Sequence, residues 1–198
     1  MNKKIKTAIL ISGRGSNMKA LIEAAKNPNY PAEIALVISN KENASGLDFA
    51  SQNHIKTAVI NHKNFASRQD FDQEMVKLID NNNCQIVCLA GFMRLLSEWF
   101  VDRFQDRMIN IHPSLLPAFK GEKAVVDALN YGVKISGCTT HFVTREMDSG
   151  PIILQTAVEV LKNDTAELLA ARILKQEHII YPKSLEIVCN QIIKNYKR

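Results

Sequence analysis

Short apolar runs alternate, through the first half of the chain, with segments in which apolar residues recur at helical spacing. The run at residues 5–12 has the length and composition of a buried strand, and Met18, Leu21 and Ile22 then recur along one helix face. Strands and helices in alternation are typical of βαβ units, which stack into a mostly parallel sheet. The predicted strands cover residues 5–12, 34–39, 57–60, 86–90 and 108–111, and the predicted helices cover residues 17–26, 44–53, 71–79 and 96–104.

The second half of the chain has a different pattern, because its β-rich segments follow each other directly. Residues 137–143 and 152–160 are both rich in strand-forming residues, and the turn sequence Asp148-Ser149-Gly150-Pro151 lies between them. Such a turn predicts an antiparallel pair of strands. The preceding residues 115–121 are rich in strand and helix breakers, so we expect a loop at a strand end.

A long helix is predicted from Asp164 to the end of the chain. Asp164 is a typical N-cap residue, and Glu167 follows at the spacing of a capping box. Proline lacks the backbone N–H that a helix needs, so we expect a break at Pro182. Together these elements predict a Rossmann-like α/β fold, in which a mostly parallel central sheet has helices on both faces and an antiparallel strand pair in its C-terminal half.

Length and composition agree with a single domain. The 198 residues, of which 46% are hydrophobic, suffice for one well-buried core, so we expect residues 1–198 to form one domain. The apolar run near the start is interrupted by Ser12-Gly13-Arg14, unlike a signal peptide, and no other run approaches the roughly 20 residues that span a bilayer. We expect a cytoplasmic protein with no membrane partner, present as a monomer or a weak homodimer.

Charge and cysteine content argue against two other classes of protein. The formal net charge of +5 is scattered, and the basic tail at residues 192–198 is interpreted as a solvated helix end, so we expect no nucleic-acid partner. The cysteines form no CxxC pair and have no histidines near them at zinc spacing, so we expect buried free thiols and no metal site. They are Cys84, Cys88, Cys138 and Cys189.

The segment Ser12-Gly13-Arg14-Gly15-Ser16-Asn17 lies between a predicted strand and a predicted helix. Backbone N–H groups and the helix dipole favour a bound anion at such a position, and glycine lets the backbone approach it closely. The pattern is neither GxGxxG nor a Walker sequence, so it indicates only a phosphate or another anion. The alternative is a plain glycine turn in which Ser16 caps the helix.

Asn110 and His112 stand at the carboxyl end of a predicted central strand, where open α/β sheets bind their ligands. Residues two apart in a strand point to the same side, so the two side chains should project together. Two polar groups on one face of a buried strand are costly unless they have partners or a role. For His112 the alternative is a hydrogen-bonded core histidine, and His141 is interpreted as either a core residue or a support for the site.

Two further segments are candidates for chemistry or binding. Asp148 lies in the turn after the strand that carries His141, and a carboxylate near an imidazole orients it and raises its pKa, so that the pair exchanges protons near neutral pH. The alternative is an ordinary turn. Residues 89–96 end another strand with apolar groups and Arg94, which would suit a flat heteroaromatic ligand; the alternative is ordinary packing at a helix entry.

Taken together, these stretches resemble one family, the glycinamide ribonucleotide formyltransferases of purine synthesis, which use 10-formyltetrahydrofolate. The resemblance implies an enzyme that transfers the formyl group of this donor co-substrate to the glycine amine of 5-phosphoribosylglycinamide, so that its partners are small molecules. It covers nearly the whole chain in ordered blocks at residues 11–17, 89–96, 110–121, 141–151 and 176–178.

The resemblance also implies which residues bind the two substrates. Leu174 stands where the family often carries a polar residue, one helical turn before Glu177, and residues 122–126 lack a histidine that some members carry, so no role is assigned there. The implied ribonucleotide site comprises Gly15, Ser16, Asn17, Leu174 and Glu177, and the implied folate site comprises Arg68, Met93, Arg94, Leu95, Leu96, Asn110, Thr144, Arg145, Glu146, Met147 and Asp148.

The reaction of that family is a direct acyl transfer, in which the substrate amine attacks the formyl carbon and negative charge builds on the formyl oxygen. No serine or cysteine nucleophile is required. The resemblance implies three catalytic residues: Asn110 and protonated His112 would stabilise the oxyanion, while Asp148 would keep His112 charged and help to move the proton from the amine to the leaving folate nitrogen.

Three other functions are alternatives at this point. The formyltransferase of initiator methionyl-tRNA and the hydrolase of formyl-folate share the Asn-x-His and Asp elements, but each carries an additional domain for which we expect no room in this chain. The loop Gly15-Ser16-Asn17 further favours the ribonucleotide. The third alternative is a non-catalytic nucleotide or folate binding module on the same scaffold, against which the intact Asn110, His112 and Asp148 argue.

Overall fold

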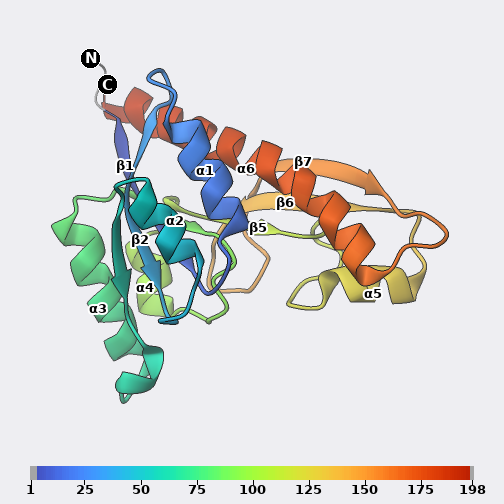
Figure 1. Cartoon of the computed structure of the whole chain (residues 1–198), viewed down its shortest axis with the longest axis horizontal. Coiled ribbons are helices and arrows are strands. Elements are labelled where there is room, and N and C mark those ends of the chain that lie inside the picture. Colours follow the sequence, from blue (N-terminus) through green and yellow to red (C-terminus); the bar gives the residue numbers. More distant parts are fainter. Residues whose placement is uncertain (1–3, 197–198) are drawn as a thin grey trace.

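The computed structural model describes residues 4–196, which form a seven-stranded sheet. The strand order is β3-β2-β1-β4-β5-β6-β7 (Figure 1), with β1 to β5 parallel and β6 and β7 antiparallel to their neighbours. The predicted α/β fold, with a mostly parallel sheet and an antiparallel C-terminal pair, is confirmed. The strands are β1 Ile5–Ile11, β2 Ala32–Ser39, β3 Lys56–Val59, β4 Ile86–Leu89, β5 Met108–His112, β6 Ile135–Phe142 and β7 Ile152–Glu159.

Helices cover both faces of the sheet. Because successive side chains of a strand point to opposite faces, β1 contributes Ile9 and Ile11 to one core, and Ala8 and Leu10 to the other. The first core packs against α1 and α6, and the second packs against α3 and α4. The helices are α1 Ser16–Ala25, α2 Gly46–Gln52, α3 Arg68–Asn81, α4 Glu98–Arg103, α5 Ala124–Tyr131 and α6 Ala166–Tyr196, with a 3₁₀ helix η1 at His62–Asn64.

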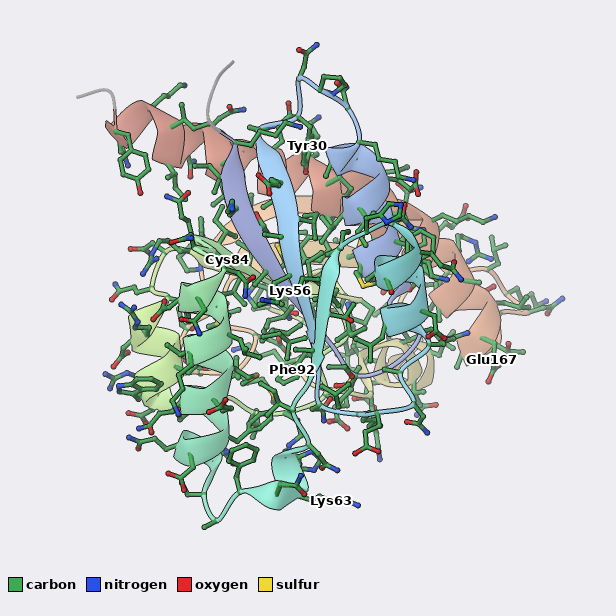
Figure 2. All side chains as sticks on the ribbon, turned by 60° about the vertical axis from the view of Figure 1, so that its left-hand side comes forward. Tyr30, Lys56, Lys63, Cys84, Phe92 and Glu167 are labelled. Atoms are coloured by element: carbon green, nitrogen blue, oxygen red, sulfur yellow. The ribbon has the colours of Figure 1, made fainter. Side chains whose placement is uncertain are left out.

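The strand order also determines where a ligand can bind. The chain adds β2 and β3 on one side of β1 and then returns to add β4 and β5 on the other side. At such a reversal the connections leave in opposite directions, and a crevice forms at the carboxyl ends of the two central strands. Figure 2 shows Phe92, just after β4, at this end of the sheet, whereas Tyr30 and Cys84 lie toward the opposite end.

Two details predicted for the long helix are wrong. Asp164 does not cap α6, because its carboxylate accepts the N–H of Leu161 at 2.8 Å and forms an ion pair with Arg172 at 2.7 Å. Instead, the hydroxyl of Thr165 accepts the N–H of Leu168 at 3.3 Å.

Nor does α6 break at Pro182, since it is continuous from Ala166 to Tyr196 (Figure 1). Tyr181 and Leu185, on either side of the proline, are fully buried, and the hydroxyl of Tyr30 donates to the carbonyl of Pro182 at 2.6 Å. A proline inside a helix costs about 3 kcal/mol, and the packing of both helix halves against the sheet offsets this cost.

Four smaller points concern helix α5, the cysteines, membrane-spanning helices and the basic tail. Helix α5 was not predicted, and it is short, with Ala124 and Ala128 facing the core. The four cysteines are buried and free, as predicted, and burial raises the pKa of Cys138 to about 12. Across residues 4–196 no helix combines the length and apolar character of a membrane span. Of the basic tail, Lys197 and Arg198 lie outside the described residues.

Candidate active site

The end of β5 and the turn after β6 bring together the three residues to which catalysis was assigned. Asn110 and His112 lie on β5, and the antiparallel register places His141 of β6 directly beside Asn110. The chain then turns back toward β7, and Asp148 lies within this turn. Asn110, His112 and Asp148 therefore meet at the carboxyl end of the parallel strands.

The imidazole of His112 is only 5% exposed, and both of its nitrogens face hydrogen-bond acceptors. Its Nδ1 lies 3.4 Å from Oδ2 of Asp148, and its Nε2 lies 2.8 Å from the carbonyl oxygen of Phe119. A neutral imidazole carries one N–H and one lone pair, so it satisfies only one of these acceptors. Each nitrogen of His112 therefore lies where it can donate a hydrogen bond.

The carboxylate of Asp148 is held ionised by its neighbours. Burial alone would raise the pKa of Asp148, but contacts with His141, the hydrogen bond from the Gly121 N–H at 2.9 Å and the charges of both histidines hold that pKa below its ordinary value. At neutral pH an anionic Asp148 therefore faces His112. The backbone of Asp148 has a φ of 51°, a left-handed conformation that aspartate tolerates better than most residues.

His141 connects Asn110 to Asp148. Its Nδ1 donates to the carbonyl oxygen of Phe142 at 2.8 Å, and its Nε2 faces both Asn110 and Asp148. The side-chain Nδ2 of Asn110 lies 3.3 Å from this Nε2, and Oδ1 of Asp148 lies 3.6 Å from the same atom. This contact orients the side-chain amide of Asn110. His141 was interpreted as either a core residue or a support for the site, and these contacts agree with the second interpretation.

The segment Ser12-Gly13-Arg14-Gly15-Ser16-Asn17, which we call the anion loop, has the geometry expected of a helix N-terminus. Gly15 has a φ of 64° and occupies the N-cap position of α1, so the alternative in which Ser16 caps the helix is wrong. A side chain at Gly15 would be strained by this φ, and its Cβ would lie 3.0 Å from the Cε of Met18. The free N–H groups of the first turn of α1 therefore remain available for an anion.

A buried polar pair joins the anion loop to the long helix. The amide of Asn17 donates to Oε2 of Glu177 at 2.7 Å, and the two residues are 8% and 6% exposed. Burial raises the pKa of Glu177, although the bond from Asn17 opposes this rise. Oδ1 of Asn17 is buried and has no hydrogen-bond partner among the described residues. Leu174 lies one turn earlier on α6 and is half-buried.

The segment to which folate binding was assigned is much more exposed. Met93 and Leu95 are each 59% exposed, and Met147 is 52% exposed. The N–H of Ser97 donates to Oδ2 of the fully buried Asp72 at 2.6 Å, which fixes the end of the segment against α3. Arg68 begins α3, and its charge acts on Asp72, one helical turn later, so it lies at the border of the segment.

The turn from Thr144 to Asp148 is attached at both ends by charged side chains. Arg145 bonds to Asp102 with a distance of 2.9 Å between Nε and Oδ1, and its guanidinium lies 3.1 Å from Glu98, so the turn is joined to α4. On the other side, Lys120 contacts Glu146 at 3.3 Å and also contacts Ser149. Three apolar residues of the folate assignment, Met93, Leu95 and Met147, therefore lie at exposed positions.

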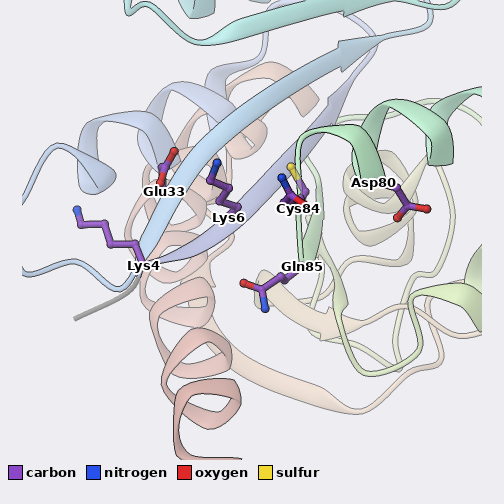
Figure 3. Close-up of a pocket in the computed structure, with 7 residues that line it drawn as sticks. Lys4, Lys6, Glu33, Asp80, Cys84 and Gln85 are labelled. Atoms are coloured by element: carbon purple, nitrogen blue, oxygen red, sulfur yellow. The ribbon is translucent and has the colours of Figure 1, made fainter. Parts of the chain in front are cut away.

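A separate cavity lies away from these residues. It has a volume of about 620 Å³, opens at the amino ends of β1, β2 and β4, and is lined by Lys4, Lys6, Glu33, Asp80, Asn83, Cys84 and Gln85 (Figure 3). It mixes both charge signs and contacts none of the residues assigned to a site. Within residues 4–196, no group of His, Cys, Asp and Glu side chains has an arrangement that could hold a metal ion.

Comparison with known proteins identifies the family of this chain. Residues 5–185 match the model of the formyl transferase family. The phosphoribosylglycinamide formyltransferase of Escherichia coli (strain K12) is 44% identical over 174 residues, which are 88% of this chain and 82% of that protein. This chain belongs to the formyl transferase family.

Other members of the formyl transferase family show which kind of formyltransferase this chain is similar to. Glycinamide ribonucleotide transformylase 1 from Symbiobacterium toebii superimposes with a TM-score of 0.94 at 41% identity, covering 96% of this chain and 90% of that one. The human trifunctional purine biosynthetic protein adenosine-3 is 47% identical over 192 residues, but the chain spans only 19% of its length. The resemblance stated from the sequence blocks is confirmed, because the chain is similar over most of its length to phosphoribosylglycinamide formyltransferases.

Two backbone groups that contact His112 and Asp148 were not predicted from the sequence. The carbonyl of Phe119 accepts from His112, and the N–H of Gly121 donates to Asp148. Both belong to the predicted loop at residues 115–121, but backbone groups carry no residue-type signal. The ion pair between Arg145 and Asp102 was missed for a similar reason, because it joins residues far apart in the sequence.

Proposed function

We propose that this chain transfers the formyl group of 10-formyltetrahydrofolate to the glycine amine of 5-phosphoribosylglycinamide, a step of purine biosynthesis, and that residues 1–198 act as a single cytoplasmic catalytic domain. The observation that carries the proposal is the contact between His112 and Asp148 at 3.4 Å, with the amide of Asn110 beside it. The name of two relatives that this chain covers over most of their length, phosphoribosylglycinamide formyltransferase, supports the ribonucleotide as the formyl acceptor, whereas the folate donor comes from the resemblance of the sequence blocks.

The ribonucleotide binds across the anion loop and α6. Its phosphate accepts the first N–H groups of α1 at Gly15, Ser16 and Asn17, since a helix N-terminus favours negative charge. Glu177 lies beside this loop through its bond to Asn17, and its carboxylate accepts a hydroxyl or amine N–H of the ribonucleotide. Leu174 offers only an apolar contact one turn earlier. The unpartnered Oδ1 of Asn17 supports this placement, because a buried acceptor without a donor is costly.

The folate donor binds on the exposed apolar surface between the segment after β4 and the turn before β7. Met93, Leu95 and Met147 provide a surface on which a flat pteridine loses contact with water, and their exposure supports this assignment. Other contacts come from the side chains or backbone of Arg94, Leu96, Asn110, Thr144, Arg145, Glu146 and Asp148. Arg68 faces the acidic tail of the folate.

The reaction is a direct attack of the glycine amine on the formyl carbon. As the C–N bond forms, the carbonyl electrons move to the formyl oxygen, which the second N–H of Asn110 and the cationic ring of His112 stabilise. Removing one such donor typically costs on the order of 100 to 1,000 fold in rate. Asp148 keeps His112 charged and accepts the proton that the amine loses. This proton then reaches the leaving folate nitrogen as its bond to the formyl carbon breaks.

The contact between His112 and Phe119 places a condition on this mechanism. Nε2 of His112 already donates to the carbonyl of Phe119, so its proton reaches the formyl oxygen only after that bond is exchanged. The loop at residues 115–121 therefore shifts when the donor binds. The exchange replaces one acceptor by another, so it preserves the hydrogen bonding of the ring.

An absorbance assay of tetrahydrofolate release tests the proposal. The purified chain is mixed with 10-formyltetrahydrofolate and glycinamide ribonucleotide, together and separately. We expect tetrahydrofolate to be released only when both are present, in equal amount to the formylated ribonucleotide. Release without the ribonucleotide would indicate a hydrolase, and binding of both compounds without release would indicate a non-catalytic module; either result overturns the proposal.

A further inference from the structure

A line of hydrogen bonds crosses the carboxyl ends of four neighbouring strands. The Oγ of Ser12, after β1, accepts the N–H of Met93, after β4, at 2.8 Å and donates to Oδ1 of Asn40, after β2, at 2.6 Å. Nδ2 of Asn40 lies 3.4 Å from Nδ1 of His62, after β3. The order of these residues follows the order of the strands in the sheet. We call Ser12, Asn40 and His62 the strand-end network.

The centre of the strand-end network is fixed by burial. Ser12 is 6% exposed and Asn40 is 2% exposed, so water does not compete for their hydrogen bonds. The backbone N–H of Met93 can only donate, so the Oγ of Ser12 accepts from it and donates its own proton to Oδ1 of Asn40. Ser12 also donates its own N–H to the carbonyl of Gly91 at 3.1 Å. It therefore holds the chain on both sides of Phe92.

Ser12 is at the same time the first residue of the anion loop. The next residue, Gly13, accepts the N–H of Gly46 at 3.1 Å, and a Cβ at Gly46 would lie 2.7 Å from Cδ1 of Ile11. This close packing ties the loop to the start of α2 and leaves little freedom between β1 and Gly15. A change in the position of the anion loop is therefore transmitted to the Oγ of Ser12, and from there to Met93.

We propose that Ser12, oriented by Asn40, is a positioning residue that couples the two substrate sites, so that each substrate raises the affinity for the other. The inference rests on the proposed function, which assigns the ribonucleotide phosphate to the anion loop and the folate to the segment after β4. A phosphate that orders the loop fixes Ser12, and Ser12 then presents the folate segment in one geometry. Coupling of this kind is reciprocal, so the folate raises the affinity for the ribonucleotide by the same factor.

The coupling is measured with a pair of ligands that cannot react. Tetrahydrofolate carries no formyl group, so its Kd is determined by calorimetry alone and in the presence of saturating glycinamide ribonucleotide. For the wild-type chain we expect the ribonucleotide to lower this Kd by about fivefold or more. In Ser12→Ala, we expect the Kd of tetrahydrofolate alone to rise about fivefold, and the ribonucleotide to leave it almost unchanged. Ser12→Thr, which keeps a hydroxyl, should restore the coupling.

A matched control separates coupling from general loosening of the sheet. Thr7→Val also removes a buried hydroxyl from β1, at the opposite end of the strand, where Oγ1 donates to the carbonyl of Ile5 at 3.3 Å. We expect this variant to keep the wild-type ratio of Kd values. If thermal unfolding shows that Ser12→Ala does not fold, Asn40→Ala is measured instead. This variant keeps the Oγ of Ser12 as the acceptor of the Met93 N–H but removes the amide that orients this hydroxyl. We therefore expect it to reduce the ratio of Kd values.

Three results would overturn the inference. A wild-type chain that binds both ligands with no change in Kd has no coupling to explain. A Ser12→Ala or Asn40→Ala variant that keeps the wild-type ratio excludes the strand-end network as its source. A wild-type chain that binds neither ligand removes the proposed function and the coupling together, whereas the first two results leave the proposed function standing.

Discussion

The ribonucleotide half and the folate half of the site are built in opposite ways. In the first, Asn17 and Glu177 are 8% and 6% exposed and share a bond of 2.7 Å. In the second, Met93 and Leu95 are each 59% exposed, and Arg145, which attaches the adjoining turn, has 58% of its side chain exposed. A buried polar contact holds one geometry, whereas exposed apolar groups and surface ion pairs adapt to a ligand. We therefore expect the contact between Asn17 and Glu177 to be formed before the ribonucleotide binds, and the folate half to be completed by its ligand.

Among the substitutions that test this comparison, we expect removal of the buried carboxylate of Glu177 to change substrate binding most. Glu177→Ala deletes the acceptor of Asn17 and the proposed partner of the ribonucleotide. Hydrogen bonds to charged groups contribute enough that we expect the KM for the ribonucleotide to rise about 30-fold, with a smaller change in the KM for the folate. Steady-state kinetics measure both constants. The control is Glu186→Ala, at an exposed position of the same helix. Equal effects of the two variants would contradict a preformed contact between Asn17 and Glu177.

The buried charge of Glu177 should also lower the free energy of unfolding at neutral pH. Burial raises the pKa of Glu177 above its ordinary value of 4.5. The stability that a carboxyl with a raised pKa contributes is fully present below its unfolded pKa and is lost as the pH rises through the folded pKa. Glu177→Gln stays neutral, so we expect its Tm to exceed that of the wild type by roughly 2–4 °C at pH 7 and to match it at pH 4. Equal differences at both pH values would show that burial of the charge is not the cause.

The smallest expected effect comes from the exposed attachment of the folate half. Arg145→Ala removes the bonds to Asp102 and the ion pair with Glu98. Since these groups are exposed, we expect the KM for the folate to rise only about twofold at low salt, and the difference to disappear near 1 M salt, where charges are screened. Arg103→Ala, which breaks the exposed ion pair with Asp80 at 3.0 Å, serves as the control. A loss that persists at high salt would contradict an electrostatic attachment.

Local patterns in the sequence predicted much of the fold. The alternation of side chains placed Asn110 and His112 on one side of β5, and the turn before β7 predicted the antiparallel pair. The helix predicted at residues 96–104 contains α4, which the hydroxyl of Ser97 caps by accepting the N–H of Phe100 at 3.3 Å. These features depend on the periodicity of a strand and on the side chains of single residues, so they are readable without knowledge of the fold.

The features that were wrong or missed depend on contacts between distant segments. Asp164 has the right residue type for a cap, but Arg172 takes its carboxylate. Pro182 has the right type for a break, but the sheet packs against both sides of it. The carbonyl of Phe119 reaches His112 only because a loop folds back over β5, and Ser12 meets Asn40 only because β1 lies beside β2. Residue type indicates what a side chain prefers, but tertiary structure decides which partner it meets.

Asp148 lies where the two halves meet, and the transfer of a proton through it is the most direct consequence of the proposed mechanism. Asp148→Asn keeps an oxygen that accepts the N–H of Gly121 but loses the charge that faces His112. Its single-turnover rate, measured with both substrates bound and compared with its Kd for each, tests the mechanism. We expect the rate to fall by at least about 100-fold while both Kd values change less than about twofold. A variant that transfers the formyl group at close to the wild-type rate would show that this carboxylate moves no proton.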